Sequence, residues 1–177
     1  DFFRTESINL KSHWVMVVID QFTRRIVGFA VHPGHITGID ACRMFNTIIA
    51  KKNFPKYLSS DNDPLFKFYR WQANLQIVDI EEIKTIPYAP LSHPFVERLI
   101  GSIRRELLDQ TLFWTAADLE TKLRSYQHYY NEKSGHLGIE GNTPLEKSRC
   151  AEQKLLNIND HRWKKHCRGL FQLPIAA

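Results

Sequence analysis

Three acidic residues in this chain have the type and spacing to bind divalent metal ions. Asp61 and Glu97, with 35 residues between them, are the only Asp-to-Glu pair at that separation. Asp61 ends a segment, 56–61, that is typical of a strand, and Glu97 lies at the start of a helical segment, 95–110. Carboxylates placed in this way can converge on a metal. Together with Asp1 they would supply the three acidic ligands that metal-assisted phosphoryl transfer uses.

Other roles compete for the same residues. Asp61 could instead cap the helix that follows it, and Asp63 competes both for that capping role and for the ligand role. Glu97 could be a solvated helix residue, although its place directly after a proline-terminated loop favours a ligand. Asp20 follows a predicted strand and precedes a turn, so it is the alternative first carboxylate. Turn formation is the other explanation for Asp20.

Composition limits the class of protein. The length of 177 residues suits one domain, and 43% hydrophobic residues are enough for a core. A net charge of +5 is compatible with a polyanionic partner, but many proteins of this charge bind no nucleic acid. The three cysteines form no CxxC pair, which favours a reducing cytosol over a zinc module or a disulfide framework.

Targeting patterns are absent from the sequence. No apolar run approaches the roughly 20 residues of a membrane span, and no segment has the pattern of a signal peptide. Because the chain begins with Asp1 and not with Met, we expect it to be a piece of a longer protein.

Hydrophobic patterns predict the elements that must position these side chains. Strands at 1–3, 13–20 and 25–31, with a turn at 21–24, form an antiparallel meander. The predicted elements that follow are a helix at 38–52 capped by Thr37, a strand at 56–60, a helix at 65–75, a strand at 80–86, a loop at 88–94, and helices at 95–110 and 115–130. This order predicts an α/β fold with a mixed five-stranded sheet, a three-strand antiparallel meander and then βαβ, flanked by helices.

Several ordered motifs together resemble the DDE integrase-core family, which includes retroviral integrases and bacterial insertion-sequence transposases. The motifs are DFF at 1–3, IDQFTRRIVGFAVHP at 19–33, YLSSDND at 57–63, PFVERLIGSIRRELLDQ at 94–110 and YYNEKSGHLGIEGNTPLEKS at 129–148. The resemblance covers residues 1–148 and implies an RNase H-like catalytic core there, with residues 149–177 as a basic C-terminal tail. His93 stands where relatives often have Asn, and residues 134–136 replace the usual Arg-Pro-His.

The resemblance also implies an activity. It implies a polynucleotidyl transferase that nicks DNA at element ends and joins the 3′-hydroxyl to target DNA. Two Mg²⁺ or Mn²⁺ ions would be held by Asp1, Asp61 and Glu97. The implied partners are element-end and target DNA and at least a second copy of the chain, with no membrane, in a bacterial cytoplasm at the nucleoid. The alternatives are an RNase H-type metal-dependent nuclease and an inactive relic that only binds DNA or protein.

Basic residues are the candidates for DNA contact. Arg104 follows Glu97 by seven residues, two helical turns, so it projects from the same helix face. Four further candidates are Arg98 and Arg105 on that helix and Lys164 and Lys165 in the basic tail.

Overall fold

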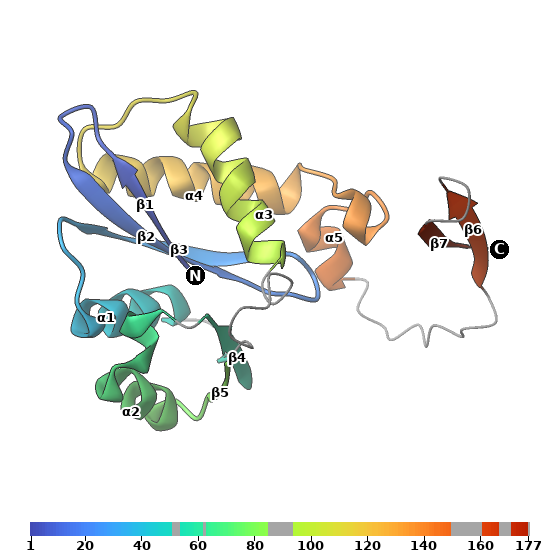
Figure 1. Ribbon diagram of the computed structural model, residues 1–177. Coiled ribbons are helices and arrows are strands. Elements are labelled where there is room, and N and C mark those ends of the chain that lie inside the picture. Colours follow the sequence, from blue (N-terminus) through green and yellow to red (C-terminus); the bar gives the residue numbers. More distant parts are fainter. Residues whose placement is uncertain (51–53, 62, 85–93, 150–160, 167–170, 177) are drawn as a thin grey trace.

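The structure is a computed structural model that describes residues 1–50, 54–61, 63–84, 94–149, 161–166 and 171–176. An antiparallel sheet of three strands, in the order β1-β2-β3, lies between two layers of helices (Figure 1). Its strands are β1 (Phe2–Glu6), β2 (Ser12–Ile19) and β3 (Ile26–Pro33). One face is covered by α3 (Pro94–Ile103) with its π-helical continuation η2 (Arg104–Leu108), and by α4 (Ala116–Glu132). The other face is covered by α1 (Gly38–Ile49), with α2 (Tyr69–Ile77) packed behind it.

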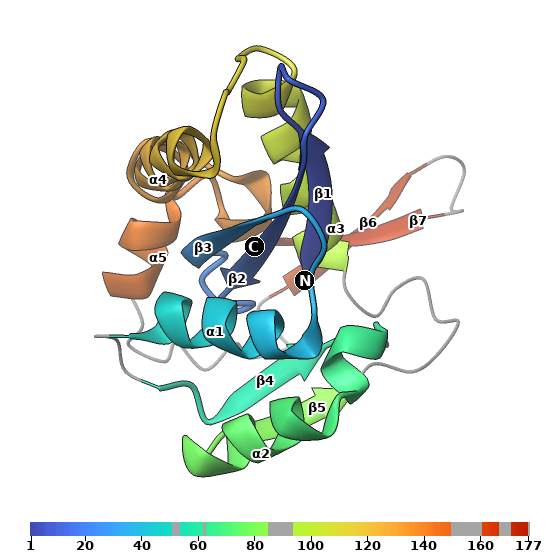
Figure 2. The ribbon, with the colours of Figure 1, turned by 90° about the vertical axis from the view of Figure 1, so that its left-hand side faces the viewer.

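Two further sheets are small. β4 (Tyr57–Ser60) and β5 (Glu81–Lys84) form a parallel pair, which lies on the α1 and α2 side in both views (Figures 1 and 2). The remaining elements are η1 (Pro64–Lys67), η3 (Leu137–Ile139), α5 (Pro144–Arg149), β6 (His161–His166) and β7 (Phe171–Ala176). β6 and β7 pair as an antiparallel hairpin in the segment that was predicted as a basic tail. No helix among the described residues is long and apolar enough to cross a membrane.

Strand β2 is buried on both faces, as its continuous apolar run predicts. Val15 and Val17 belong to the core formed with α3 and α4, whereas Met16 belongs to the core formed with α1 and α2. Successive side chains of a strand point to opposite faces, so one strand supplies both cores. The predicted central strand is therefore confirmed.

Helix α1 begins at the predicted cap. The Thr37 hydroxyl accepts a hydrogen bond from the Asp40 amide, and the Asp40 carboxylate accepts one from the Thr37 amide at 3.0 Å. This reciprocal pair satisfies backbone donors that a helix start leaves without partners. The helix ends at Ile49, earlier than the predicted residue 52, and residues 51–53 lie outside the described part of the chain.

The predicted helix at 65–75 is interrupted. A 3₁₀ helix, η1, precedes α2, and Phe68 between them is extended with ψ of 131°. The Phe68 side chain lies against Gly38 at the start of α1, so closely that a Cβ on Gly38 would clash with it. The chain bends at Phe68, where this side chain packs on α1. A contact with a helix about thirty residues away cannot be predicted from the local pattern of apolar residues.

The five strands are hydrogen-bonded as two sheets, not as the single predicted sheet. No ladder among the described residues joins β1–β3 to β4–β5. At this end of the sheet Phe2 pairs with Met16, and the backbone of Asp1 bonds to Val17. A cavity of about 430 Å³ lies there, lined by Val18 and Ile19 on one side and by β4 on the other.

Candidate active site

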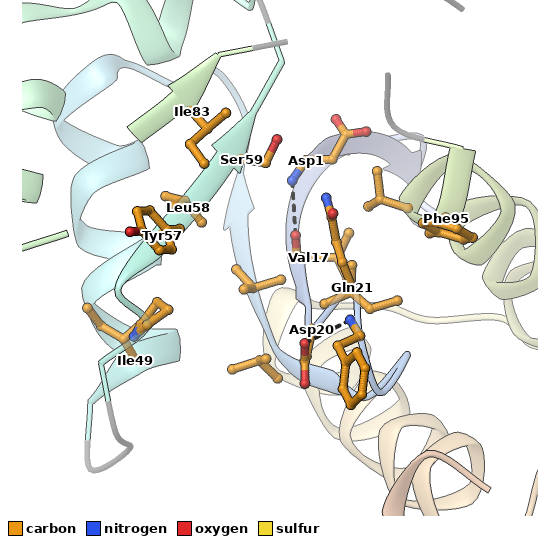
Figure 3. A pocket seen from close by; sticks show the side chains of 16 residues that line it. Asp1, Val17, Asp20, Gln21, Ile49, Tyr57, Leu58, Ser59, Ile83 and Phe95 are labelled. Carbon is orange, nitrogen blue, oxygen red and sulfur yellow. Dashed lines mark hydrogen bonds between the residues drawn. The ribbon is translucent and has the colours of Figure 1, made fainter. Parts of the chain in front are cut away.

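Asp1 stands where β1 meets the cavity. Its α-nitrogen donates to the Val17 carbonyl at 3.0 Å, and its own carbonyl accepts from the Val17 amide at 2.9 Å. One carboxylate oxygen accepts from the Phe2 amide at 2.6 Å. Figure 3 shows Asp1 at one end of the cavity, with Ser59 of β4 on one side and the start of α3 on the other. Strand pairing thus fixes the backbone of this candidate ligand.

Asp61 directly follows β4 and lies near Asp1. The negative charges of Asp61 and Asp63 both act at the backbone nitrogen of Asp1, which places the two carboxylates in its neighbourhood. Asp61 Oδ1 accepts from the Asp63 amide at 3.1 Å. Asp63 Oδ1 in turn accepts from the Leu65 amide at 2.8 Å, so Asp63 is the cap of η1. The capping role that competed for Asp61 therefore belongs to Asp63.

Glu97 lies in the first turn of α3 and is exposed. The buried face of this helix consists of Val96, Leu99 and Ile103, which follow the helical spacing and pack against the sheet. Glu97 makes no hydrogen bond or ion pair with another described residue. A carboxylate is favoured in the first helical turn by the helix dipole, and this one remains available to a cation.

The described residues do not form a closed metal cage. No group of three or more His, Cys, Asp or Glu side chains among them is arranged to hold a metal ion. The charge of Asp61, which follows β4, acts at Asp1, which precedes β1. Glu97 lies on α3. Carboxylate oxygens are the donors that Mg²⁺ and Mn²⁺ prefer, so the chemistry of the three predicted ligands fits such ions.

Asp20, the alternative first carboxylate, forms a turn. One of its carboxylate oxygens accepts from the Phe22 amide at 3.0 Å, and the other accepts from the Thr23 hydroxyl at 2.6 Å. These bonds close the loop between β2 and β3, as expected for an Asp at the start of a turn. Its predicted turn role is confirmed, although the residue also lines the cavity (Figure 3).

Three of the five basic candidates, Arg98, Arg104 and Arg105, lie on α3 and η2. Arg104 is exposed, and its guanidinium is 3.5 Å from the Arg4 carbonyl and 6.0 Å from the centre of the Phe3 ring. It therefore lies beside β1, the strand that follows Asp1. Arg98 and Arg105 are also exposed. Lys164 and Lys165 fall in β6, whose side chains lie outside the described part of the structure.

Two structural features escaped the sequence analysis. Asn131 is 7% exposed and bonds to both backbone groups of Ile26. Arg24, in the turn before Ile26, stacks on Phe95 at the start of α3. The only sequence signal for Asn131 is its place four residues after Gln127, which bonds to the same strand. No local signal exists for Arg24, because its partner is far away in the chain.

Known proteins with similar sequences and structures were found. A family model described as the integrase core domain matches residues 78–144. An uncharacterized 39.2 kDa protein of insertion element IS476 from Xanthomonas euvesicatoria is 28% identical over 77% of this chain. The chain covers 39% of the length of that relative.

Two solved integrase cores share the fold. The catalytic core domain of BIV integrase is similar over 82% of this chain and 89% of its own, with 24% identity and a TM-score of 0.58. The HTLV-2 integrase catalytic core domain, solved in complex with magnesium in a dimeric form, covers the same shares with 18% identity and a TM-score of 0.61.

These findings agree on one class of protein. The fold is the RNase H-like fold of integrase catalytic cores. The integrase-core match over residues 78–144, the insertion-element relative and the integrase structures all agree with the resemblance to the DDE integrase-core family. The resemblance noted from the sequence motifs is thereby confirmed. The chain spans less than half of the length of the curated relative, so the activity of the whole protein is a matter of proposal.

Proposed function

We propose that this chain is the catalytic core of a DDE transposase or integrase. It would be a metal-dependent polynucleotidyl transferase that nicks DNA at element ends and joins the 3′-hydroxyl to target DNA. The observation that supports the proposal is that the charge of Asp61 acts at Asp1 in a fold shared with integrase cores, while the Glu97 carboxylate on α3 pairs with no other described residue. In this proposal residues 1–148 are the core and residues 149–177 are a basic segment.

Asp1, Asp61 and Glu97 would hold two Mg²⁺ or Mn²⁺ ions. When bound, such ions polarise a phosphodiester and activate water or a hydroxyl as nucleophile. The task of the chain is to deliver three carboxylates from three elements. Asp1 directly precedes β1, Asp61 directly follows β4, and Glu97 lies in the first turn of α3. The position of the first turn of α3 would therefore determine where the Glu97 carboxylate lies relative to the other two.

Arg104 would bind the DNA backbone beside these carboxylates. It is exposed and lies over β1, close to the strand that carries Asp1. The exposed Arg98 and Arg105 on α3 and η2 would add contacts, as would Lys164 and Lys165 from the C-terminal segment. Contacts of this kind give affinity that depends on salt, not sequence choice. Joining two element ends would further require at least two copies of the chain on DNA, in a bacterial cytoplasm at the nucleoid.

A branched DNA that mimics a strand-transfer product tests the activity. The protein is incubated with this DNA in Mn²⁺ and in Mg²⁺, beside Glu97→Gln and the control Glu120→Gln, whose carboxylate pairs with Arg124 on α4. We expect metal-dependent cutting and rejoining that falls at least about a hundred-fold in Glu97→Gln, since a metal ligand contributes several kcal/mol to the transition state. Glu120→Gln should retain activity.

Two other results would replace the proposal. Cutting without rejoining would indicate the RNase H-type nuclease. Absence of reaction together with absence of Mn²⁺ binding in calorimetry would indicate an inactive relic. Equal activity of Glu97→Gln and the wild type would remove Glu97 from the catalytic set.

A further inference from the structure

The turn between β2 and β3 holds an arginine in an unusual backbone conformation. Arg24 has φ of +64°, in the left-handed region that residues with a Cβ rarely occupy. The conformation is imposed from both sides of the turn, because the Asp20 carboxylate binds Phe22 and Thr23 and the Asp20 amide donates to the Arg25 carbonyl at 2.8 Å. A strained residue held this firmly suggests a role for its side chain.

The Arg24 side chain crosses from the sheet to helix α3. Its guanidinium carbon lies 3.1 Å from the centre of the Phe95 ring, a stacked cation–π contact. Phe95 is the second residue of α3, two positions before Glu97. Figure 3 shows Phe95 at the start of α3, on the wall of the cavity opposite β4. The contact therefore joins the β2–β3 turn to the helical turn that carries Glu97.

The electrostatic surroundings of the Arg24 guanidinium are partly unfavourable for a positive charge. Arg24 Nη1 is buried and has no hydrogen-bond partner among the residues that the structure describes. Burial lowers its pKa, Tyr130 and Asp20 act in the opposite direction, and the positive charge of Arg98 adds to the lowering. A cation near the amino end of a helix also opposes the helix dipole. A guanidinium in these surroundings is consistent with a role of Arg24 in positioning α3.

We propose that Arg24 is a positioning residue for the proposed reaction: by stacking on Phe95 it fixes the first turn of α3 and thereby the Glu97 carboxylate. The inference rests on the proposed function for its catalytic consequence, whereas the coupling between the turn and the helix stands independently of it. Arg24 acts through Phe95 and contacts neither metal nor DNA. Its loss should therefore reduce turnover and leave DNA affinity unchanged.

The test compares Arg24→Ala, Arg24→Lys, Phe95→Leu and the double variant with the matched control Arg25→Ala, an exposed arginine of the same turn. Two readouts are used, turnover of the branched DNA and hydrogen exchange of the amides in the first turns of α3. Alanine keeps the Cβ, so the backbone strain at this position is the same and only the stacking group is lost.

We expect Arg24→Ala and Phe95→Leu to lower kcat about ten- to hundred-fold, because small displacements of a catalytic group have effects of this size. KM for DNA should stay within about two-fold, and α3 amides should exchange faster. Lysine should restore part of the turnover. The double variant should be no worse than the worse single variant, since both remove the same contact. Arg25→Ala should resemble the wild type.

Unchanged hydrogen exchange of the α3 amides in both Arg24→Ala and Phe95→Leu would overturn the proposal. It would also be overturned if Arg24→Ala changed only KM for DNA and its dependence on salt, because Arg24 would then be a DNA contact. If Glu97→Gln remains active while Arg24→Ala still accelerates exchange in α3, the proposed function fails and the positioning of the helix by Arg24 stands. Should Arg24→Ala fail to fold, Phe95→Leu alone decides the result by the same two readouts.

Discussion

Replacing Asn131 by alanine should destabilise the protein strongly, although the residue is polar. Its side-chain oxygen accepts from the Ile26 amide at 2.9 Å, and its side-chain nitrogen donates to the Ile26 carbonyl at 3.0 Å. Asn131 thus provides the hydrogen bonds that a neighbouring strand would provide at the start of β3. Both residues are buried, so water cannot replace these bonds after the substitution.

The magnitude follows from counting the groups that lose partners. The Ile26 carbonyl keeps a bond from Gln127 at 3.0 Å, but the Ile26 amide loses its side-chain acceptor inside the core. A buried amide without a partner costs about 1–3 kcal/mol, and the second lost bond costs about 1 kcal/mol. We therefore expect Asn131→Ala to lower the free energy of unfolding by about 2–4 kcal/mol, a large part of the stability of an ordinary domain.

Urea unfolding measures this difference, and Gln127→Ala is the control. Gln127 is less buried and donates to the Ile26 and Val27 carbonyls, both at 3.0 Å. After its removal the Ile26 carbonyl still accepts from Asn131 and no buried amide loses its acceptor, so the control should lose only about 0.5–1.5 kcal/mol. The slope of the unfolding free energy with urea should be the same in all three proteins, which shows that only stability has changed. A loss below about 0.5 kcal/mol for Asn131→Ala, or equal losses for the two variants, would refute the reasoning.

Two further substitutions test the packing around Gly38 and the charge of a half-buried histidine. Gly38→Ala should cost about 1–3 kcal/mol in urea unfolding, because its Cβ clashes with Phe68, whereas Gly138→Ala, with open space around it, should be close to neutral; equal effects would remove the clash as the cause. His136 packs on the Tyr130 ring at 4.3 Å, and burial lowers its pKa below the usual value of about 6.5. Because the unfolded chain then binds the proton more readily, stability should fall as pH is lowered through about 6.5, and His136→Phe should flatten that part of the profile; matching slopes would contradict the argument.

Much of the fold follows from local patterns in the sequence. The run at 13–20 predicts a strand buried on both faces, and Val15, Met16 and Val17 confirm it. Thr37 predicts the start of α1 because capping depends only on the next three residues. The break at Phe68 could not be predicted, since it depends on how that ring meets a helix far away in sequence.

The sequence could predict which residues belong to the candidate site, but it could not predict how their side chains are arranged. Asp1, Asp61 and Glu97 were selected by their motifs, and their assignment as metal ligands remains a prediction. Only the structure gives the cap of η1 to Asp63 and brings the charge of Asp61 to bear on Asp1. Whether strands join in one sheet also depends on tertiary placement, because an extended segment has no partner specified by its own sequence.

The sequence by itself determined most of the elements up to α4, their order and the family motifs, because periodicity and caps act over a few neighbouring residues. The tertiary structure alone decided which distant groups meet. Asn131 reaches the backbone of Ile26 across 105 positions of the chain, and Arg24 reaches Phe95 at the start of α3. Such contacts are set by how helices pack on the sheet, which depends on the whole core and not on any one segment.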